Sequence, residues 1–208
     1  MEKPINALAN IERRTTTLFF EEREPLEFYL RGGISWPQIV DRGDASDFEG
    51  FALLGGLNLE TQKVEIFEQR PFLTVEHVLE QDPYSKTKKI EYHGLGPWFN
   101  KCWNKYYAKT FYYHQDTELN KRYLLEVLHS KWINPQPHFP KVPWLDDDEA
   151  QMTVWRYVRF KKLVIEKDTQ LAKELAMVKP GEKVVKPSIH ALQCLLTSLD
   201  RFPPRFPK

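Results

Sequence analysis

Hydrophobic and polar positions alternate along the first third of the chain, as they do in half-buried antiparallel strands. Within residues 15–31, one side of the alternation carries Leu26, Phe28 and Leu30. The segment stops at Gly32, which begins a pair of glycines. Period-two alternation ended by glycine is typical of strands. Residues 15–31 therefore predict one or two strands.

A second region of strand character lies between residues 50 and 69. Two apolar runs rich in β-prone residues flank the short polar sequence Glu60–Gln62. Such a pattern predicts an antiparallel hairpin with its turn at the polar residues. Gly55 and Gly56 interrupt the first arm, and glycines inside a strand indicate a bulge or the close packing of another element.

Beyond the hairpin the apolar spacing changes to three and four residues, which is typical of helices. A cap at Asp146, followed by Glu149, predicts the start of one of these helices; the β-prone stretch 153–160 inside it leaves a strand as an alternative. Pro97 suits the first turn of another. The helices predicted in this way cover residues 72–81, 97–113, 116–133, 146–167, 169–178 and 188–202.

The segment 134–144 interrupts the helical half with four prolines. Proline has no backbone N–H and fixes φ, so this segment predicts an extended strap rather than a helix or a central strand. The whole pattern predicts an α+β fold: an N-terminal antiparallel β-sheet with a hairpin, and a mostly helical C-terminal half packed on or beside it. We expect one compact unit with a β-rich half over 1–96 and a helical half over 97–208.

Composition agrees with a globular chain and excludes several classes of protein. Hydrophobic residues make up 41% and charged residues 28% of the 208 residues, which provides material for a core. The two cysteines are too few for a disulfide framework and have no zinc-ligand spacing. No membrane span and no secretory signal are predicted. These features predict a cytoplasmic protein that does not enter a membrane.

The net charge of +1 hides an asymmetry between the two halves. Residues 1–96 carry 11 Lys and Arg against 17 Asp and Glu, a net charge of −6, whereas residues 97–208 carry 19 against 12, a net charge of +7. A basic half can mark contact with a polyanion. The alternative is that the two halves neutralise each other within one globule.

The first basic surface lies on the predicted helix 97–113. On a helical wheel, Lys101, Lys105 and Lys109 share one sector with Trp98 and Tyr112. The remaining rings of the helix fall on the other side. This separation favours a core helix with a lysine edge. Trp98 and Tyr112 are then the rings beside the charges, where a nucleic-acid base could stack.

A second basic surface lies on the helix predicted over 146–167. Arg156, Arg159 and Lys162 project away from its apolar arc, and Trp155 lies four residues before Arg159, as in a cation–π pair. Arginine, lysine and an exposed aromatic ring suit phosphates and bases. The same face could instead dock on the acidic half.

An acidic cluster precedes the hairpin and raises a catalytic hypothesis. Asp41, Asp44 and Asp47, together with Glu76 further along, could hold two cations in a metal-dependent phosphodiesterase. The spacing matches no calcium loop, and no further carboxylate completes a site. Aspartate is also common in solvated turns, so a loop is the favoured interpretation and no metal site is assigned.

Taken together, the sequence predicts a non-enzymatic accessory or interaction protein whose basic helical half binds a polyanion, with nucleic acid as the leading partner. The predicted contact residues are Lys101, Lys105, Lys109, Arg156, Arg159, Lys162, Trp98 and Trp155. The first alternative is a structural or assembly subunit that binds protein partners or a second copy of itself. The second is the metal-dependent nuclease. No cofactor motif and no catalytic constellation is found.

Overall fold

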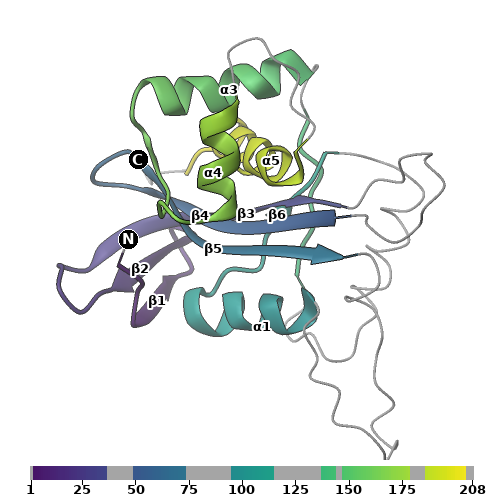
Figure 1. Ribbon diagram of the computed structural model, residues 1–208. Helices are drawn as coiled ribbons and strands as arrows, with labels where there is room; N and C mark the ends of the chain where they lie inside the picture. The colour runs from purple at the N-terminus through teal and green to yellow at the C-terminus, as the bar shows by residue number, and fades with distance from the viewer. Residues whose placement is uncertain are drawn as a thin grey trace, which may run out of the picture.

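A mostly antiparallel β-sheet forms the middle layer of the protein, with helices on both of its faces (Figure 1). The structure is a computed structural model, and it describes residues 2–36, 49–73, 95–114, 137–143, 147–178 and 186–204. An N-terminal sheet followed by C-terminal helices confirms the predicted α+β class.

The first five strands run antiparallel in chain order. The sheet order is β1-β2-β3-β4-β5-β7, and β6 pairs with β3. The two short strands β6 and β7 run parallel to β3 and β5 respectively. The strands are β1 (Asn6–Asn10), β2 (Thr15–Phe19), β3 (Leu26–Ser35), β4 (Glu49–Asn58), β5 (Val64–Leu73), β6 (Phe111–Tyr112) and β7 (Leu163–Val164).

The hairpin predicted over residues 50–69 is confirmed as β4 and β5. Its turn is fixed by Asn58, whose Oδ1 accepts hydrogen bonds from the amides of Glu60 (3.0 Å) and Thr61 (3.1 Å). Gln62 closes the turn with a φ of 57°. The Asn58 side chain takes the place of a backbone hydrogen-bond acceptor in the turn. This explains why the short polar sequence Glu60–Gln62 is long enough to connect the two strands.

The bulge predicted at the two glycines is also confirmed. Leu54 lies opposite Glu68 and Gly55 lies opposite Ile66, so Phe67 is the extra residue in β5. Phe67 belongs to one core cluster and Ile66 to the other. The extra residue thereby places Phe67 and Glu68 on the same face of the sheet, which a regular strand would not do.

Among the described helices, α1 lies below the sheet and α3, α4 and α5 lie above it in the view of Figure 1. Helix α1 packs under the sheet with Phe28, Leu54 and Phe67. On the opposite face α5 lies nearest the strands, and α3 and α4 pack around it. The helices are α1 (Leu95–Tyr106), α3 (Asp147–Arg159), α4 (Gln170–Met177) and α5 (Pro187–Arg201). The last two confirm the helices predicted over 169–178 and 188–202.

Helix α5 is the most buried helix among the described residues. Its predicted apolar stripe of Ile189, Leu192, Leu195, Leu196 and Leu199 is buried. The helix approaches β3 so closely that a Cβ atom at Gly33 would overlap the carbonyl oxygen of Ala191 and lie 2.9 Å from the amide nitrogen of Leu195. Glycine at this position therefore sets the distance between the helix and the sheet.

The helix predicted over 97–113 is wrong at its C-terminal end. It stops at Tyr106, because Tyr107 turns into the left-handed region with a φ of 55° and its amide donates to the carbonyl of Trp103. The chain then becomes extended, and Phe111 and Tyr112 pair with β3. Pairing with the sheet overrides the helical spacing that continues in the sequence.

The helix predicted over 146–167 is also too long. It ends at Arg159, and Lys161 adopts a φ of 53° while its amide and that of Lys162 bond back to Val158 and Tyr157. This is the hydrogen-bond pattern of a Schellman motif. Leu163 and Val164, which follow, form β7 and pair with β5.

The predicted strap is extended where the structure describes it, over residues 137–143. Thr110 pairs with His138, and Tyr113 pairs with Lys141, both in parallel bridges. The amides of His138 and Val142, which lie between prolines, donate to backbone carbonyls of residues 109 and 113. The helix predicted over 72–81 is wrong at its start, because residues 72 and 73 belong to β5. The rest of it and the helix predicted over 116–133 lie outside the described residues.

We expect Gly33→Ala to lower the free energy of unfolding by about 3 kcal/mol, because the added methyl group meets helix backbone that cannot move aside. Gly56→Ala is the matched control. Its Cβ would meet the end of the flexible Leu30 side chain at 2.7 Å, so a loss of about 1 kcal/mol is expected. Urea denaturation measures both variants, and equal losses would contradict the close helix contact.

Candidate nucleic-acid interface

The lysine edge consists of Lys101, Lys105 and Lys109, and part of it makes contacts within the protein. The Nζ atom of Lys101 lies 2.8 Å from Oε2 of Glu68, a carboxylate whose side chain is only 7% exposed. The hydroxyl of Tyr106 donates to the other oxygen of the same carboxylate at 2.7 Å. Lys101 therefore neutralises a carboxylate of the acidic half and is engaged within the fold.

The bulge in β5 is the reason that this carboxylate reaches α1. Phe67 and Glu68 both point to α1, where Phe67 stacks on the ring of Tyr106 with centroids 5.8 Å apart. Burial raises the pKa of the Tyr106 hydroxyl far above its ordinary value, and the hydrogen bond to Glu68 raises it further. Tyr106 therefore remains a proton donor to Glu68 across the physiological range.

The other two lysines of the edge have aromatic neighbours. The Nζ of Lys105 lies 5.3 Å from the ring centroid of Tyr106, and burial lowers the pKa of this ammonium while Glu68 opposes that change. Lys109 lies beyond the end of α1, is exposed, and has its Nζ 5.7 Å from the ring centroid of Trp103. Both distances suit cation–π contacts.

The predicted placement of Trp98 and Tyr112 as exposed rings beside the lysines is wrong. Each residue is only 7% exposed. Trp98 packs against Phe99 and Phe111, with ring centroids 5.4 and 5.3 Å away. Tyr112 lies on β6 rather than on the helix. Both rings are held in the core, because α1 is covered on this side by the strand and strap that follow it.

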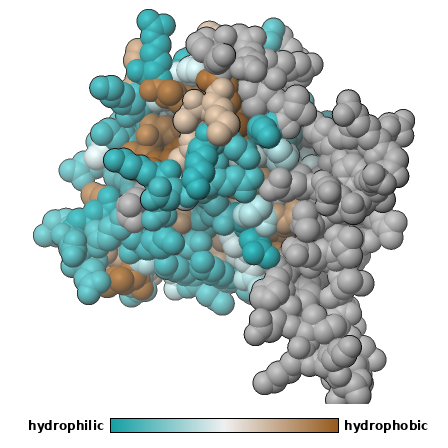
Figure 2. All heavy atoms as spheres, in the orientation of Figure 1, coloured by the Kyte–Doolittle hydropathy of each residue, from teal (hydrophilic) through white to brown (hydrophobic). Residues whose placement is uncertain are grey.

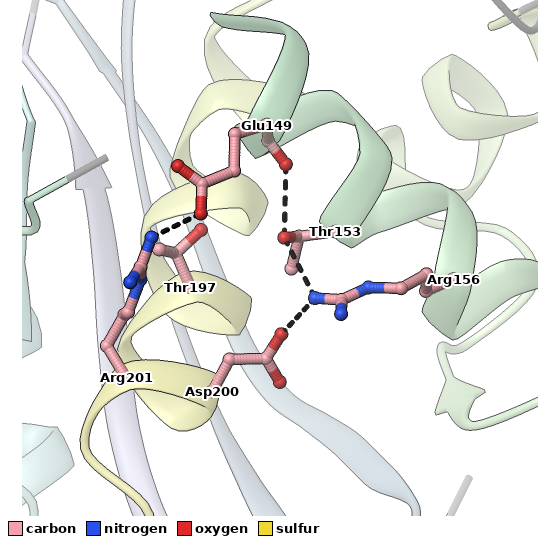
Figure 3. Close-up of a pocket in the computed structure, with 6 residues that line it drawn as sticks. All are labelled: Glu149, Thr153, Arg156, Thr197, Asp200 and Arg201. Carbon is pink, nitrogen blue, oxygen red and sulfur yellow. Dashed lines mark hydrogen bonds and ion pairs between the residues drawn. The ribbon is translucent and has the colours of Figure 1, made fainter. Parts of the chain in front are cut away.

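Arg156 of α3 lies in a polar cavity between α3 and α5 (Figure 3). The cavity has a volume of about 360 Å³. The guanidinium of Arg156 is paired with Asp200 and hydrogen bonds to Thr153 at 3.2 Å, and Arg201 is paired with Glu149. Two arginines and two carboxylates thus neutralise each other, which leaves Arg156 engaged within the fold.

The C-terminal end of α3 is different. Arg159, Phe160, Lys161 and Lys162, which we call the basic turn, are all exposed, and the side chain of Phe160 is 65% exposed. Among the residues that the structure describes, no carboxylate lies within ion-pair distance of the three cations. The basic turn is therefore a concentrated positive charge with an aromatic ring inside it.

The backbone of the basic turn is held on both sides. The Schellman hydrogen bonds join Lys161 and Lys162 to the last turn of α3. The carbonyl of Lys162 accepts a hydrogen bond from the amide of Val64 in β5 at 2.7 Å. Two elements of the fold thus fix the direction in which these side chains leave the protein.

Trp155 and Arg159 do not form the expected cation–π pair among the described contacts. Trp155 is half-buried, and its Nε1 is enclosed without a hydrogen-bond acceptor in the described part of the chain. An indole that is turned into the protein offers little of its ring to a base. Phe160 is the more accessible ring on this surface.

The two predicted basic surfaces do not join. Helix α1 packs on the face of the sheet that carries Phe28 and Phe67, whereas α3 lies above the other face with Val154 in the second core cluster (Figure 1). The lysines of α1 and the basic turn are therefore separate sites with the sheet between them.

Phe160 and Lys161 were missed as candidate contact residues. If α3 is extended to residue 167, Lys161 falls inside the apolar arc of the helix and Phe160 is one ring among several. The run of Arg, Phe, Lys and Lys was visible in the sequence. Its exposure depends on the helix ending at Arg159.

Apolar side chains also gather on the surface over α3 and α4, in the upper part of the face shown in Figure 2. Met152 of α3 is 61% exposed and Met177 of α4 is 73% exposed. The other coloured residues on this face are largely hydrophilic. Such a patch is the kind of surface that the assembly hypothesis requires.

A serine and a histidine meet at the end of β3. Oγ of Ser35 lies 3.0 Å from Nδ1 of His190 on α5, and the ring of His114 lies 6.4 Å from that of His190. Ser35 is only 2% exposed. The hydroxyl is thus enclosed between β3 and α5, and the contact serves to join them rather than to attack a substrate.

The residues of the nuclease hypothesis, Asp41, Asp44, Asp47 and Glu76, lie outside the described residues. In the described ranges, no three His, Cys, Asp or Glu side chains come together as a metal site would require. Burial raises the pKa of both thiols, Cys102 and Cys194, which therefore stay protonated.

Comparison with protein-family models, with curated proteins and with solved structures gives no match for this chain. Within the described part of the chain, every helix is too short or too polar to span a bilayer.

We expect Tyr106→Phe to destabilise the protein by about 2 kcal/mol, because it removes a buried hydrogen bond to a charged carboxylate. Lys101→Ala should cost about 1 kcal/mol or less, since the Lys101 side chain is 52% exposed and its pairing is screened by water and salt. Denaturation at low and high salt measures both. A larger loss of stability for Lys101→Ala than for Tyr106→Phe would contradict these expected values.

Proposed function

We propose that this protein is a non-enzymatic accessory protein that binds single-stranded nucleic acid through the basic turn. The observation that carries the proposal is the exposure of three cations, Arg159, Lys161 and Lys162, with no carboxylate partner among the described residues, around the exposed ring of Phe160. Most of the other predicted contact residues are engaged within the fold.

The chemistry of the basic turn suits a phosphate backbone. Each cation that neutralises a phosphate releases condensed counterions, which is the main source of sequence-independent affinity. Arg159 can bind a phosphate through two N–H groups, and the lysines add point charges. The backbone hydrogen bonds of Lys161 and Lys162 reduce the entropy lost when a ligand binds.

Phe160 favours a single strand as the ligand. Bases of a duplex are already stacked on one another, whereas an unpaired base can stack on an exposed aromatic ring. The ring of Phe160 lies between Arg159 and Lys161 in the chain, so a base and its flanking phosphates can be contacted together. This combination of rings and cations is common in proteins that bind single strands without sequence preference.

The positive charge in the sequence around the basic turn also favours an anionic ligand. Residues 159–167 contain four cations and one carboxylate, Glu166. The half of the chain from 97 to 208 carries a net charge of +7. A positive surface raises the local concentration of an anionic ligand and its rate of association.

The binding of a labelled oligothymidylate, measured by fluorescence anisotropy over a range of salt concentrations, tests the proposal. With three phosphates neutralised, we expect the logarithm of the binding constant to fall with the logarithm of salt with a slope of about −2. The combined variant Arg159→Ala, Lys161→Ala, Lys162→Ala should lose at least about tenfold in affinity and most of this slope.

Two further variants separate the contribution of base stacking from that of charge. Phe160→Ala should weaken single-strand binding by about tenfold and leave the salt slope unchanged, because it removes stacking and not charge. Lys105→Ala with Lys109→Ala is the control, which removes cations on the other face of the sheet and should leave binding unaltered. If this control abolishes binding, or if the unaltered protein does not bind at low salt, the proposed site is wrong.

A further inference from the structure

Strand β1 forms the outer edge of the sheet and carries exposed apolar side chains. It pairs with β2 on one side and ends the strand order on the other (Figure 1). Ile5 is 65%, Leu8 is 62% and Ile11 is 89% exposed. Residues 5–11 contain no charged residue and no proline. Natural edge strands are usually protected against pairing by lysine, proline or a bulge, and β1 has none of these.

The sequence of this edge reads the same in both directions. Residues 5–11 are Ile-Asn-Ala-Leu-Ala-Asn-Ile, centred on Leu8. If two copies of β1 pair antiparallel about a two-fold axis at Leu8, identical residue types lie opposite each other along the whole segment: isoleucine, asparagine, alanine and leucine. A two-fold interface requires this kind of self-complementary surface.

From this symmetry we infer that the protein forms a homodimer in which β1 pairs antiparallel with β1 of a second copy, with Leu8 opposite Leu8. The sheet then continues from one copy into the other. This inference is independent of the proposed nucleic-acid site, because it uses a different edge of the molecule and none of the residues of the basic turn.

The backbone of β1 is suited to this register. The amide of Ala7 donates to Oδ1 of its own neighbour Asn6 at 2.8 Å. The backbone N–H and C=O groups of Ala7 and Ala9 point to the same side of the strand, because alternate residues do so. In the dimer, Ala7 of one copy lies opposite Ala9 of the other. Each Ala7–Ala9 pair can then exchange both of its backbone hydrogen bonds, as hydrogen-bonded pairs of antiparallel strands do.

The side chains are equally suited. Leu8 is opposite Leu8 in a pair without backbone hydrogen bonds, where side chains come closest together. On the same face, Asn6 meets Asn10, and two primary amides can hydrogen bond to each other. Ala7 belongs to the core cluster under the sheet, and the small Ala9 leaves room for the second copy beside it.

A second copy satisfies this edge more completely than an unrelated strand would. Any extended peptide can use the backbone groups of an edge strand. Only a strand with the same palindromic order places leucine on leucine and asparagine on asparagine without leaving an exposed isoleucine opposite a polar side chain. A different partner strand is therefore an outcome of the test and not part of the proposal.

Analytical ultracentrifugation of the full chain over a range of concentrations tests the dimer. We expect a monomer–dimer equilibrium, and we expect Leu8→Lys to raise its dissociation constant at least about tenfold, because the two introduced charges would lie opposite each other. Met177→Lys is the matched control at a side chain that is 73% exposed on α4. An unaltered protein that stays monomeric, or a dimer that tolerates Leu8→Lys, overturns the proposal.

Disulfide trapping tests the register. Leu8→Cys should cross-link two copies on oxidation, whereas Asn6→Cys alone should not, since residue 6 lies about 13 Å along the strand from its symmetry mate. A mixture of Asn6→Cys and Asn10→Cys should cross-link again. The native Cys102 and Cys194 are buried and do not interfere. Cross-linking of Asn6→Cys by itself would contradict the inferred pairing.

Discussion

The close approach of two layers to the middle of β3 is the constraint on which the rest of the structure depends. Two adjacent glycines make it possible, because neighbouring residues of a strand point to opposite faces. A Cβ at Gly32 would overlap the ring of Phe111, and one at Gly33 would overlap the backbone of α5. The aromatic cluster around α1 and the buried helix α5 can therefore both lie directly on the same strand.

The β5 bulge decides how the charge of the protein is used. By turning Phe67 and Glu68 to one face, it delivers a carboxylate to the lysine edge of α1, where Lys101 and Tyr106 bind it. On the other face, Arg156 and Arg201 are paired with Asp200 and Glu149. Of these three ion pairs, Lys101–Glu68 joins the two halves, whereas the other two lie within the basic half and leave its net charge unchanged. Among the described residues, the cations of the basic turn take no part in such pairing.

The two proposed interfaces lie on different parts of the molecule and depend on different interactions. The basic turn uses exposed charge that salt can screen and a ring that can stack. The edge of β1 uses the backbone groups of an edge strand and apolar side chains, whose association salt does not weaken. A dimer through β1 would carry two copies of the basic turn, so a long single strand could contact both and bind with higher avidity than one copy allows.

The sequence by itself determined the elements whose pattern is local. The hairpin around Asn58, the bulge at Gly55 and the apolar stripe of α5 followed from alternation, turn residues and helical spacing, and the α+β class followed from their order. Only the tertiary structure decided where α1 and α3 end, since strand pairing at Phe111 and Leu163 overrides helical periodicity. It also decided which charged residues are free, because the partner of a cation such as Lys101 lies 33 residues away in the chain and reaches it through a bulge.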